Sequence, residues 1–542
     1  MRLISTAAAL AAILVCASAV AAPDKSGNKP QAGPDAALAK PQSSTTSGSV
    51  TVAGKRIDYT AVAGTLVIHG SGDQQDEPQV SMFYVAYFKK GVAAAKRPVT
   101  FLYNGGPGSA SLWLHMGAFG PRRVVTADHT HTPAAPYKVV NNDFSLLDAS
   151  DLVFIDAPGT GFSRLIANDA DPAKRAAQMK SRKKALYGVD GDAHAFARFI
   201  TQFLSRYYRW NSPKYLFGES YGTTRSAVLA NLLENDDSVD LNGVILLSAI
   251  LNFDDSIDGP QFNPGVELPY ELALPTYAAT AFYHHRLSQQ PAALEPFLHE
   301  VVQYAMNDYA QALAAGSRLD AARKQAVAEK LHQYTGLPVA YLLKADLRVN
   351  GHMFAHELQA SDDLSVGRLD SRFAGPSYDP MAKEEDDNDP GSNAISAAYV
   401  AAFNDYLRRQ LKFGEGMRYL PGSGEIYTLW DHNHKAGGVE GDKMSSSLNV
   451  MPDLAMAMKS NPNLKVFLNG GYYDLATPYF AADYDAHHLP IPATLDSNIS
   501  YAWYPSGHMV YAHEPSLKAL HDNVAAFIEK TDHGTVSADK GK

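Results

Sequence analysis

The 542-residue chain has a single cysteine and no excess of positive charge. Its single cysteine, Cys16, cannot form an intramolecular disulfide, and it lies in an N-terminal segment that we expect to be removed, so the mature protein would have no cysteine nucleophile or ligand. Lysine and arginine number 47 against 57 aspartates and glutamates, so the formal net charge is −10. Without a basic stripe to neutralise phosphates, we expect no nucleic-acid partner.

Long apolar runs are also scarce outside the N-terminus. Residues 1–22, MRLISTAAALAAILVCASAVAA, place one arginine before a short alanine-rich apolar run that ends in small residues. This pattern predicts a secretory signal peptide, cleaved near Ala21 or Ala22, rather than a stable membrane span. Lipid attachment at Cys16 is the alternative. We therefore expect an exported protein, periplasmic or secreted, and the lack of disulfides favours a bacterial export route.

Composition divides the rest of the chain. Residues 23–48 are rich in proline, serine, glycine and lysine, which predicts a flexible linker. Residues 49–254 and 441–532 carry strand patterns, whereas 255–440 reads as helical and 533–542 as a tail. A helical block between two strand-rich parts is expected to form a cap inserted in one α/β domain.

Short, continuous apolar runs dominate the two strand-rich parts. Each ends at glycine or a polar residue, as in PVTFLYNGGPG, DLVFIDAPGTG, KYLFGESYG, LNGVILLSAI and LKVFLNGGYYD. Such runs suit strands buried on both faces of a mostly parallel sheet. The preceding stretches GTLVIHG and SMFYVAYFKKG alternate and predict antiparallel strands. The fold class is therefore α/β.

Ser220 stands at the apex of a predicted strand–turn–helix. The strand-like KYLF precedes Gly218-Glu219-Ser220-Tyr221-Gly222, and the helix-like TTRSAVLANLLEN follows it. This context is typical of the nucleophile elbow of α/β-hydrolases. We interpret Ser220 as a catalytic nucleophile.

A serine nucleophile needs a base, and the base needs an acid that orients it. In α/β-hydrolases these residues follow one another along the chain in the order serine, acid, histidine. Asp474 follows a predicted strand, and His508 follows the next one behind a Ser-Gly turn. Asp431 is the alternative acid. It opens the stretch DHNHK (431–435), whose histidines have no third ligand at metal spacing, so we expect no metal and no cofactor.

The oxyanion hole requires two backbone N–H groups. Tyr221, after the nucleophile, is expected to donate one. Gly106, in the glycine-rich turn LYNGGPGSAS (102–111), is expected to donate the other.

Five ordered segments now resemble the signatures of the serine carboxypeptidase family: NGGPGSASL, FIDAPGTGFS, GESYGT, NGGYYDLATP and SGHMVY. The resemblance implies an α/β-hydrolase with a helical cap that releases C-terminal residues from peptides. It implies Ser220, Asp474 and His508 as the triad, and Gly106 and Tyr221 as the oxyanion hole.

The family also binds the terminal carboxylate of its substrate, which implies that role for Asn104, Gly105 and Glu219. A second acidic residue is expected before FGP (119–121), but the chain has Ala118 there. Two carboxyl groups share a proton readily, and Glu219 lacks that partner. Tyr511 likewise replaces a proline that is usual after the histidine.

Other functions remain open from the sequence. The same triad could run an esterase or an acyltransferase, and a non-catalytic binding protein on a hydrolase fold is a third reading. The acidic run KEEDDNDPG (383–391) is expected to be a solvated loop, with a calcium loop as the alternative. Side-chain preference and oligomeric state are not determined by these patterns.

Overall fold

The computed structural model describes residues 37–70, 75–383, 389–436 and 447–532. The predicted signal peptide, residues 23–36 of the predicted linker and the predicted tail lie outside the described residues. Within the described part, no helix is long and apolar enough to cross a membrane.

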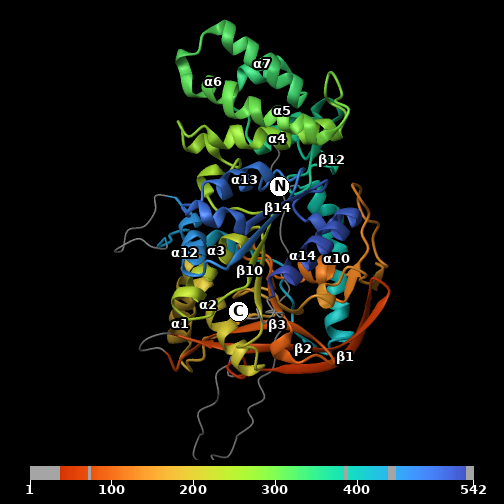
Figure 1. Ribbon diagram of the computed structural model, residues 1–542, viewed down its shortest axis with the longest axis vertical. Coiled ribbons are helices and arrows are strands. Elements are labelled where there is room, and N and C mark those ends of the chain that lie inside the picture. The colour runs from red at the N-terminus through yellow and green to blue at the C-terminus, as the bar shows by residue number, and fades with distance from the viewer. Residues whose placement is uncertain (1–36, 71–74, 384–388, 437–446, 533–542) are drawn as a thin grey trace, which may run out of the picture.

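A ten-stranded mixed sheet forms the centre of the molecule (Figure 1). Its order is β1-β2-β3-β7-β4-β9-β10-β13-β14, with β8 paired to β3. Neighbours from β7 to β14 are parallel, and β1, β2, β3 and β7 pair antiparallel. Each apolar run predicted as a buried strand lies in this sheet, so the α/β class is confirmed. The strands are β1 (Ser43–Val52), β2 (Lys55–His69), β3 (Pro78–Lys89), β4 (Val99–Tyr103), β7 (Asp151–Ile155), β8 (Arg164–Leu165), β9 (Lys214–Glu219), β10 (Gly243–Leu247), β13 (Lys465–Gly471) and β14 (Ile499–Tyr504).

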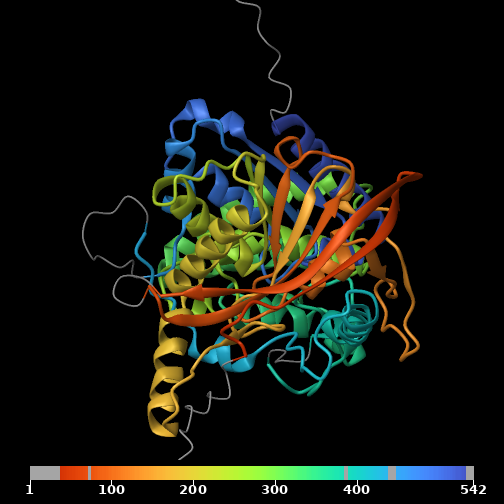
Figure 2. The same cartoon turned by 90° about the horizontal axis from the view of Figure 1, so that it is seen from below.

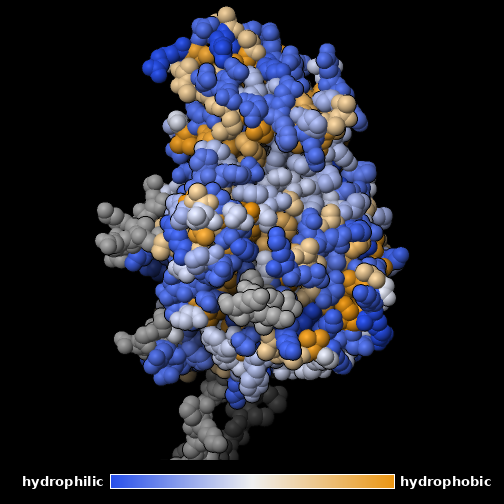
Figure 3. All heavy atoms as spheres, in the orientation of Figure 1, coloured by the Kyte–Doolittle hydropathy of each residue, from blue (hydrophilic) through white to orange (hydrophobic). Residues whose placement is uncertain are grey.

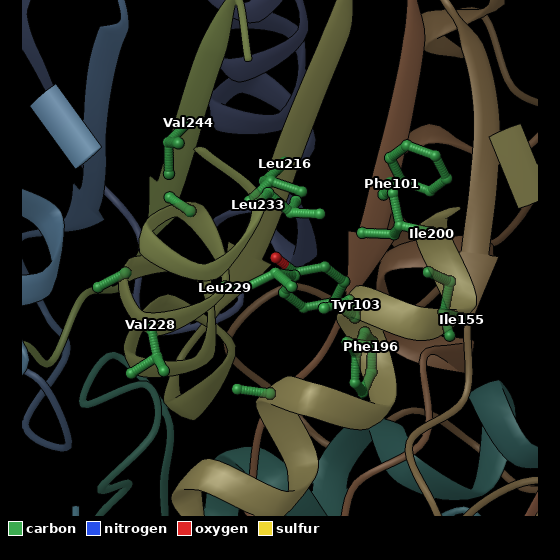
Figure 4. Close-up of a cluster of buried hydrophobic side chains, with 14 of the residues drawn as sticks. Phe101, Tyr103, Ile155, Phe196, Ile200, Leu216, Val228, Leu229, Leu233 and Val244 are labelled. Carbon is green, nitrogen blue, oxygen red and sulfur yellow. The ribbon is translucent and has the colours of Figure 1, made fainter. Parts of the chain in front are cut away.

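Helices cover both faces of the sheet (Figures 1 and 2). Successive residues of a strand point to opposite faces. Thus Phe101 and Tyr103 of β4 pack with α2 and α3 (Figure 4), whereas Leu102 joins the core that contains α10 and α14. The helices are α1 (Pro172–Leu186), α2 (Val189–Arg206), α3 (Tyr221–Asn235), α4 (Leu268–Tyr283), α5 (Leu294–Tyr304), α6 (Ala310–Ala315), α7 (Ala321–Thr335), α8 (Val339–Lys344), α9 (Gly351–Glu357), α10 (Pro390–Arg409), α11 (Gly424–Leu429), α12 (Met451–Ser460), α13 (Tyr479–His487) and α14 (Glu514–Thr531).

The strand order reverses beside β4, because β7 lies on one side of it and β9 on the other. The carboxyl ends of parallel strands at such a reversal leave a crevice in which open α/β sheets bind ligands. Both β4 and β9 end there in glycine-rich turns. The topology alone therefore points to the loops at 104–109 and 218–222.

The chain between β10 and β13 contains a separate helical cluster. Helices α4 to α9 share their own apolar core with Tyr473, Leu475 and Tyr479, next to the sheet. Helices α4 to α7 stand at one end of the molecule (Figure 1). The two short strands β11 (Leu364–Val366) and β12 (Ala374–Pro376) follow α9 and form a two-stranded sheet. A second two-stranded sheet is formed by β5 (Arg122–Val124) and β6 (Val139–Asn141).

Two parts of the structure differ from the sequence-based division. Strand β1 begins at Ser43, inside the predicted linker, because it pairs along its whole length with β2. Helix α10 lies within 255–440 but packs on the sheet, since its residues Tyr399, Phe403 and Tyr406 join the core beneath β3 and β7. Apolar helical spacing shows that a face is buried, but not against which partner.

The face drawn in Figure 3 is largely hydrophilic, with apolar residues in small groups. Asp389 of the acidic run does not simply face solvent. Its Oδ1 accepts a hydrogen bond from the Ser392 N–H at 2.5 Å and caps α10. Residues 384–388 of that run lie outside the described part.

Candidate active site

The turn at Ser220 has the strained geometry of a nucleophile elbow. Strand β9 ends at Glu219 and α3 begins at Tyr221, with Ser220 between them at φ 60° and ψ −132°. A non-glycine residue in this region costs about 1–3 kcal/mol. A Cβ on Gly218 would lie 2.1 Å from the carbonyl oxygen of Gly222, so the turn closes only around small residues.

Backbone hydrogen bonds hold this turn. The Ser220 N–H donates to the Leu247 carbonyl of neighbouring β10 at 2.9 Å. The N–H and Oγ1 of Thr223 both donate to the Ser220 carbonyl at 2.7 Å. These bonds stabilise a conformation that Ser220 would not adopt alone.

His508 and Asp474 meet at the ends of β14 and β13. Nδ1 of His508 lies 2.7 Å from Oδ2 of Asp474, and both side chains are buried. Asp474 also accepts from the N–H groups of Ala476 and Thr477 through Oδ1, and from the Thr477 hydroxyl through Oδ2. The carboxylate is therefore held on both oxygens, which orients the imidazole.

A segment of the helical insertion supports both of these loops. The His508 N–H donates to the Leu369 carbonyl at 2.6 Å, and the Leu475 N–H donates to the Arg368 carbonyl at 3.0 Å. On the other side, the hydroxyl of Ser248 donates to the His508 carbonyl at 2.7 Å. Residues 368 and 369 lie far from the predicted motifs, and no local sequence signal marks them.

The imidazole of His508 is in a mixed electrostatic environment. Burial lowers its pKa, but the charge and hydrogen bond of Asp474, helped by Glu219, raise it more, against an opposing effect of Arg368. The net pKa is above the ordinary value of histidine. His508 lines the same cleft as Ser220, and an imidazole that is easily protonated suits a base that takes a hydroxyl proton.

The glycine-rich turn after β4 lies directly against the start of α3. A Cβ on Gly105 would lie 2.4 Å from the Tyr221 nitrogen and 2.5 Å from the Gly222 nitrogen, so only glycine allows this approach. Tyr221 is the first residue of α3, where a backbone N–H has no acceptor within its own helix. Gly106, at φ 105°, lines the same cleft. The two N–H groups expected to form the oxyanion hole are thus on adjoining segments.

We predict that Gly105→Ala lowers kcat about 10²–10³-fold, because the new methyl group must push the turn away from α3 and misplace the Gly106 N–H. The fall should be similar for peptide and activated ester substrates in steady-state kinetics. Gly424→Ala is the matched control, since a Cβ there meets nothing within 4 Å. Wild-type kcat in Gly105→Ala would contradict this role of the turn.

Glu219 is buried beside the nucleophile. Its Oε2 accepts a hydrogen bond from the Tyr511 hydroxyl at 2.8 Å, and Asn104 also bonds to its carboxyl. Burial raises the pKa of Glu219 to about 7, against the lowering effects of His508, Tyr511 and Asn104. The carboxyl group is therefore partly protonated near neutral pH.

One cleft of about 860 Å³ connects these groups. The sheet side contributes the turn after β4, the elbow and the His508 loop, while the insertion contributes α9, β11 and the start of α10. Ser220, Glu219 and His508 all line it, as do Asn104, Gly105, Gly106 and Tyr221. Asp474 lies behind His508. The structure thus brings every predicted site residue to one place.

The alternative acid Asp431 and His434 lie outside this cleft, whereas His432 lines it. Asp431 is exposed, and its Oδ1 accepts from the N–H and Nδ2 of Asn433. His434 is buried between two carboxylates, with Nδ1 2.5 Å from Asp190 and Nε2 2.8 Å from Asp453. Burial lowers its pKa, but these bonds outweigh that effect and raise the pKa to about 9. His434 therefore acts as a charged anchor for its segment.

Two charged pairs near the cleft carry no sequence signature. Arg225 of α3 donates from Nη1 to the Asn104 carbonyl at 3.0 Å, and its Nε binds Asp192 at 2.5 Å. In the cleft wall, Arg368 donates through Nε to Asp258 at 2.8 Å. The first pair fixes the turn that holds Asn104, and both members of the second pair line the cleft. Both join residues distant in the chain, so sequence reasoning missed them.

Residues 63–313 match the model of the family described as serine carboxypeptidase. The match contains the turn after β4 and the elbow, and it ends before Asp474 and His508. The resemblance expected from the motifs is confirmed. No curated protein matches the chain.

Several solved structures are similar to this chain at low identity and low TM-score. A proline iminopeptidase from Mycobacterium smegmatis is 13% identical, with 86% of this chain and 99% of that chain covered and a TM-score of 0.37. A juvenile hormone epoxide hydrolase from the silkworm Bombyx mori is 11% identical, with 87% and 79% covered and a TM-score of 0.31. An alpha/beta hydrolase fold protein from Chitinophaga pinensis is 10% identical, with 86% and 97% covered and a TM-score of 0.31. Similarity at this level says nothing about substrate.

Proposed function

We propose that this chain, whose residues 63–313 match the serine carboxypeptidase family, releases C-terminal residues from peptides. The family match and the α/β-hydrolase fold make it a serine hydrolase. The observation that supports the finer proposal is the shared cleft, in which Ser220 and the His508–Asp474 pair stand beside the buried carboxyl group of Glu219.

In this reaction Ser220 Oγ attacks the carbonyl carbon of the last peptide bond, and Nε2 of His508 takes the hydroxyl proton. Asp474 accepts the hydrogen bond of Nδ1–H, which keeps Nε2 free to act as the base. The N–H groups of Gly106 and Tyr221 receive the charge on the tetrahedral oxygen. His508 then returns the proton to the leaving amine, and water releases the acyl group by the same route.

Glu219 and Asn104 would read the free carboxylate of the peptide. An ionised carboxyl would repel that carboxylate, whereas a protonated one can donate a hydrogen bond to it. Because burial raises the pKa of Glu219 to about 7, the protonated form is available in mildly acidic and neutral solution. This recognition distinguishes a carboxypeptidase from an endopeptidase on the same triad.

The proposal is tested with an N-acylated dipeptide and its C-terminal amide. Below pH 7 we expect kcat/KM for the free acid to exceed that for the amide roughly 10–100-fold, as for one hydrogen bond to a charged group. Mass spectrometry of longer peptides should show loss of single C-terminal residues. Equal rates on acid and amide would contradict carboxylate recognition. Cleavage of esters without cleavage of peptides would point to an esterase or acyltransferase instead.

The proposed place of action rests on the sequence of residues 1–22. We propose export, periplasmic or secreted, with peptides as the substrates met there. N-terminal sequencing of the protein from culture supernatant or periplasmic extract checks this cleavage, because a cleaved chain no longer begins at Met1. An uncleaved chain confined to the cytosol would contradict it.

A further inference from the structure

Tyr511 makes a contact that the family resemblance does not lead us to expect. Its hydroxyl donates to Oε2 of Glu219 at 2.8 Å, and both side chains are buried. Tyr511 lies in the turn Val510–Ala512, three residues after His508. The loop that carries the base therefore also carries the partner of Glu219.

The expected second acidic group is missing at Ala118. Its methyl side chain offers no proton, and its carbonyl oxygen accepts from Nδ2 of Asn142 at 2.7 Å. Gly117 beside it is buried in the one-turn π-helix Leu114–Phe119. The small residues Gly117 and Ala118 therefore leave room for other side chains and bring no carboxyl group to the site.

Two tyrosines fill that space. A Cβ on Gly117 would lie 2.6 Å from the Tyr511 ring and 2.5 Å from the Tyr399 hydroxyl. Tyr399 comes from α10, which packs on this face of the sheet. The π-helix and α10 therefore shape the position of the Tyr511 ring next to Glu219.

We propose that Tyr511 is the positioning residue for Glu219, with its hydroxyl taking the place of the second carboxyl group. It holds Oε2 and leaves Oε1 to carry the proton that a substrate carboxylate needs. This inference rests on the proposed carboxypeptidase function. A carboxyl partner can share a proton with Glu219, whereas a tyrosine hydroxyl in this pair only donates. Recognition of the substrate therefore depends on a single titrating proton.

The groups facing Glu219 give the direction of the effect. Burial raises its pKa, the charge of His508 and the hydrogen bonds from Tyr511 and Asn104 lower it, and Asp474 raises it. Tyr399 also lies within electrostatic reach. Burial raises the pKa of Tyr511 well above its ordinary value, so Tyr511 stays a donor and favours ionised Glu219. Removing its hydroxyl must then raise the pKa of Glu219.

The test is the ratio of kcat/KM for the free-acid dipeptide to that for its amide, measured from pH 5 to 9. The ratio cancels the titration of His508, which both substrates share. In the wild type it should fall as pH rises through about 7. In Tyr511→Phe this fall should move upward by about one pH unit, the size of one lost charge-assisted hydrogen bond.

Two further variants separate positioning from general damage. Tyr215→Phe removes another buried hydroxyl, bonded to Thr531 at 2.9 Å near the start of β9, and should leave the ratio unchanged. In a Glu219→Gln background the fall should vanish, and Tyr511→Phe should no longer alter the pH dependence of the ratio.

Each outcome decides between the two proposals. If the wild type prefers the acid but the fall stays at the same pH in Tyr511→Phe, the role of Tyr511 is wrong and the carboxypeptidase stands. If Tyr511→Phe lowers kcat/KM equally for both substrates and the acid-to-amide ratio still falls at the same pH, the role of Tyr511 is only structural. If the wild type shows no preference for the acid, the proposed function itself is wrong.

Discussion

Ser220→Ala should abolish turnover, with a loss of kcat of about 10⁶-fold. The hydroxyl is the only group at the apex of the elbow that can form the acyl intermediate, and alanine has no atom to replace it. Folding should be preserved, because the bonds that hold the turn use the backbone of Ser220. Residual turnover of an activated ester should not exceed the rate enhancement over water that the oxyanion hole and substrate binding provide without the nucleophile.

A fluorophosphonate probe supplies the second readout. Wild type should be labelled on the peptide that contains Ser220, and Ser220→Ala should not be labelled. Ser181→Ala, an exposed serine on α1, is the control and should behave as wild type. Peptidase activity retained in Ser220→Ala, or a label on another serine, would refute the nucleophile.

Asp474→Asn should lower kcat about 10⁴-fold, as expected when the orienting carboxylate is neutralised. Oδ1 accepts from the N–H groups of Ala476 and Thr477, so the asparagine oxygen is needed there. Its NH₂ group then faces Nδ1 of His508 and donates to it. The imidazole must carry its proton on Nε2, where it cannot accept one from Ser220.

The control for this prediction is Asp431→Asn. The sequence left Asp431 as a second candidate for the acid, and the structure places it at the surface with Asn433. Asp431→Asn should therefore keep wild-type kcat, and both variants should keep the wild-type melting temperature within a few degrees. If Asp431→Asn loses activity and Asp474→Asn does not, the acid has been assigned to the wrong loop.

The residues in these predictions could be located from the sequence to different degrees. Ser220 could be located because a nucleophile elbow is local: strand, tight turn and helix follow each other within about 20 residues. Asp474 and His508 were found because the fold supplies them in a known order after later strands. The sequence left Asp431 as the alternative acid, and the tertiary structure places Asp474 rather than Asp431 against His508.

The partner of Glu219 could not be predicted from the sequence. The sequence shows that Ala118 lacks the expected carboxyl group and that Tyr511 stands in place of a proline. It does not show that these two departures concern the same side chain. Tyr511 and Glu219 are 292 positions apart, and only the packing of the His508 loop against the π-helix at Gly117 brings them together.

What the sequence determined by itself is therefore the set of features that short-range patterns encode. Apolar runs that end in glycine specified the parallel strands, and the turns at their carboxyl ends specified where the reactive groups stand. Tertiary structure alone decided the partners of those groups: Leu369 for His508, Arg225 for Asn104, Tyr511 for Glu219, and the sheet for α10. The physical reason is that a hydrogen bond or a buried contact depends on distance in space, and periodicity shows which side of an element is buried without naming what covers it.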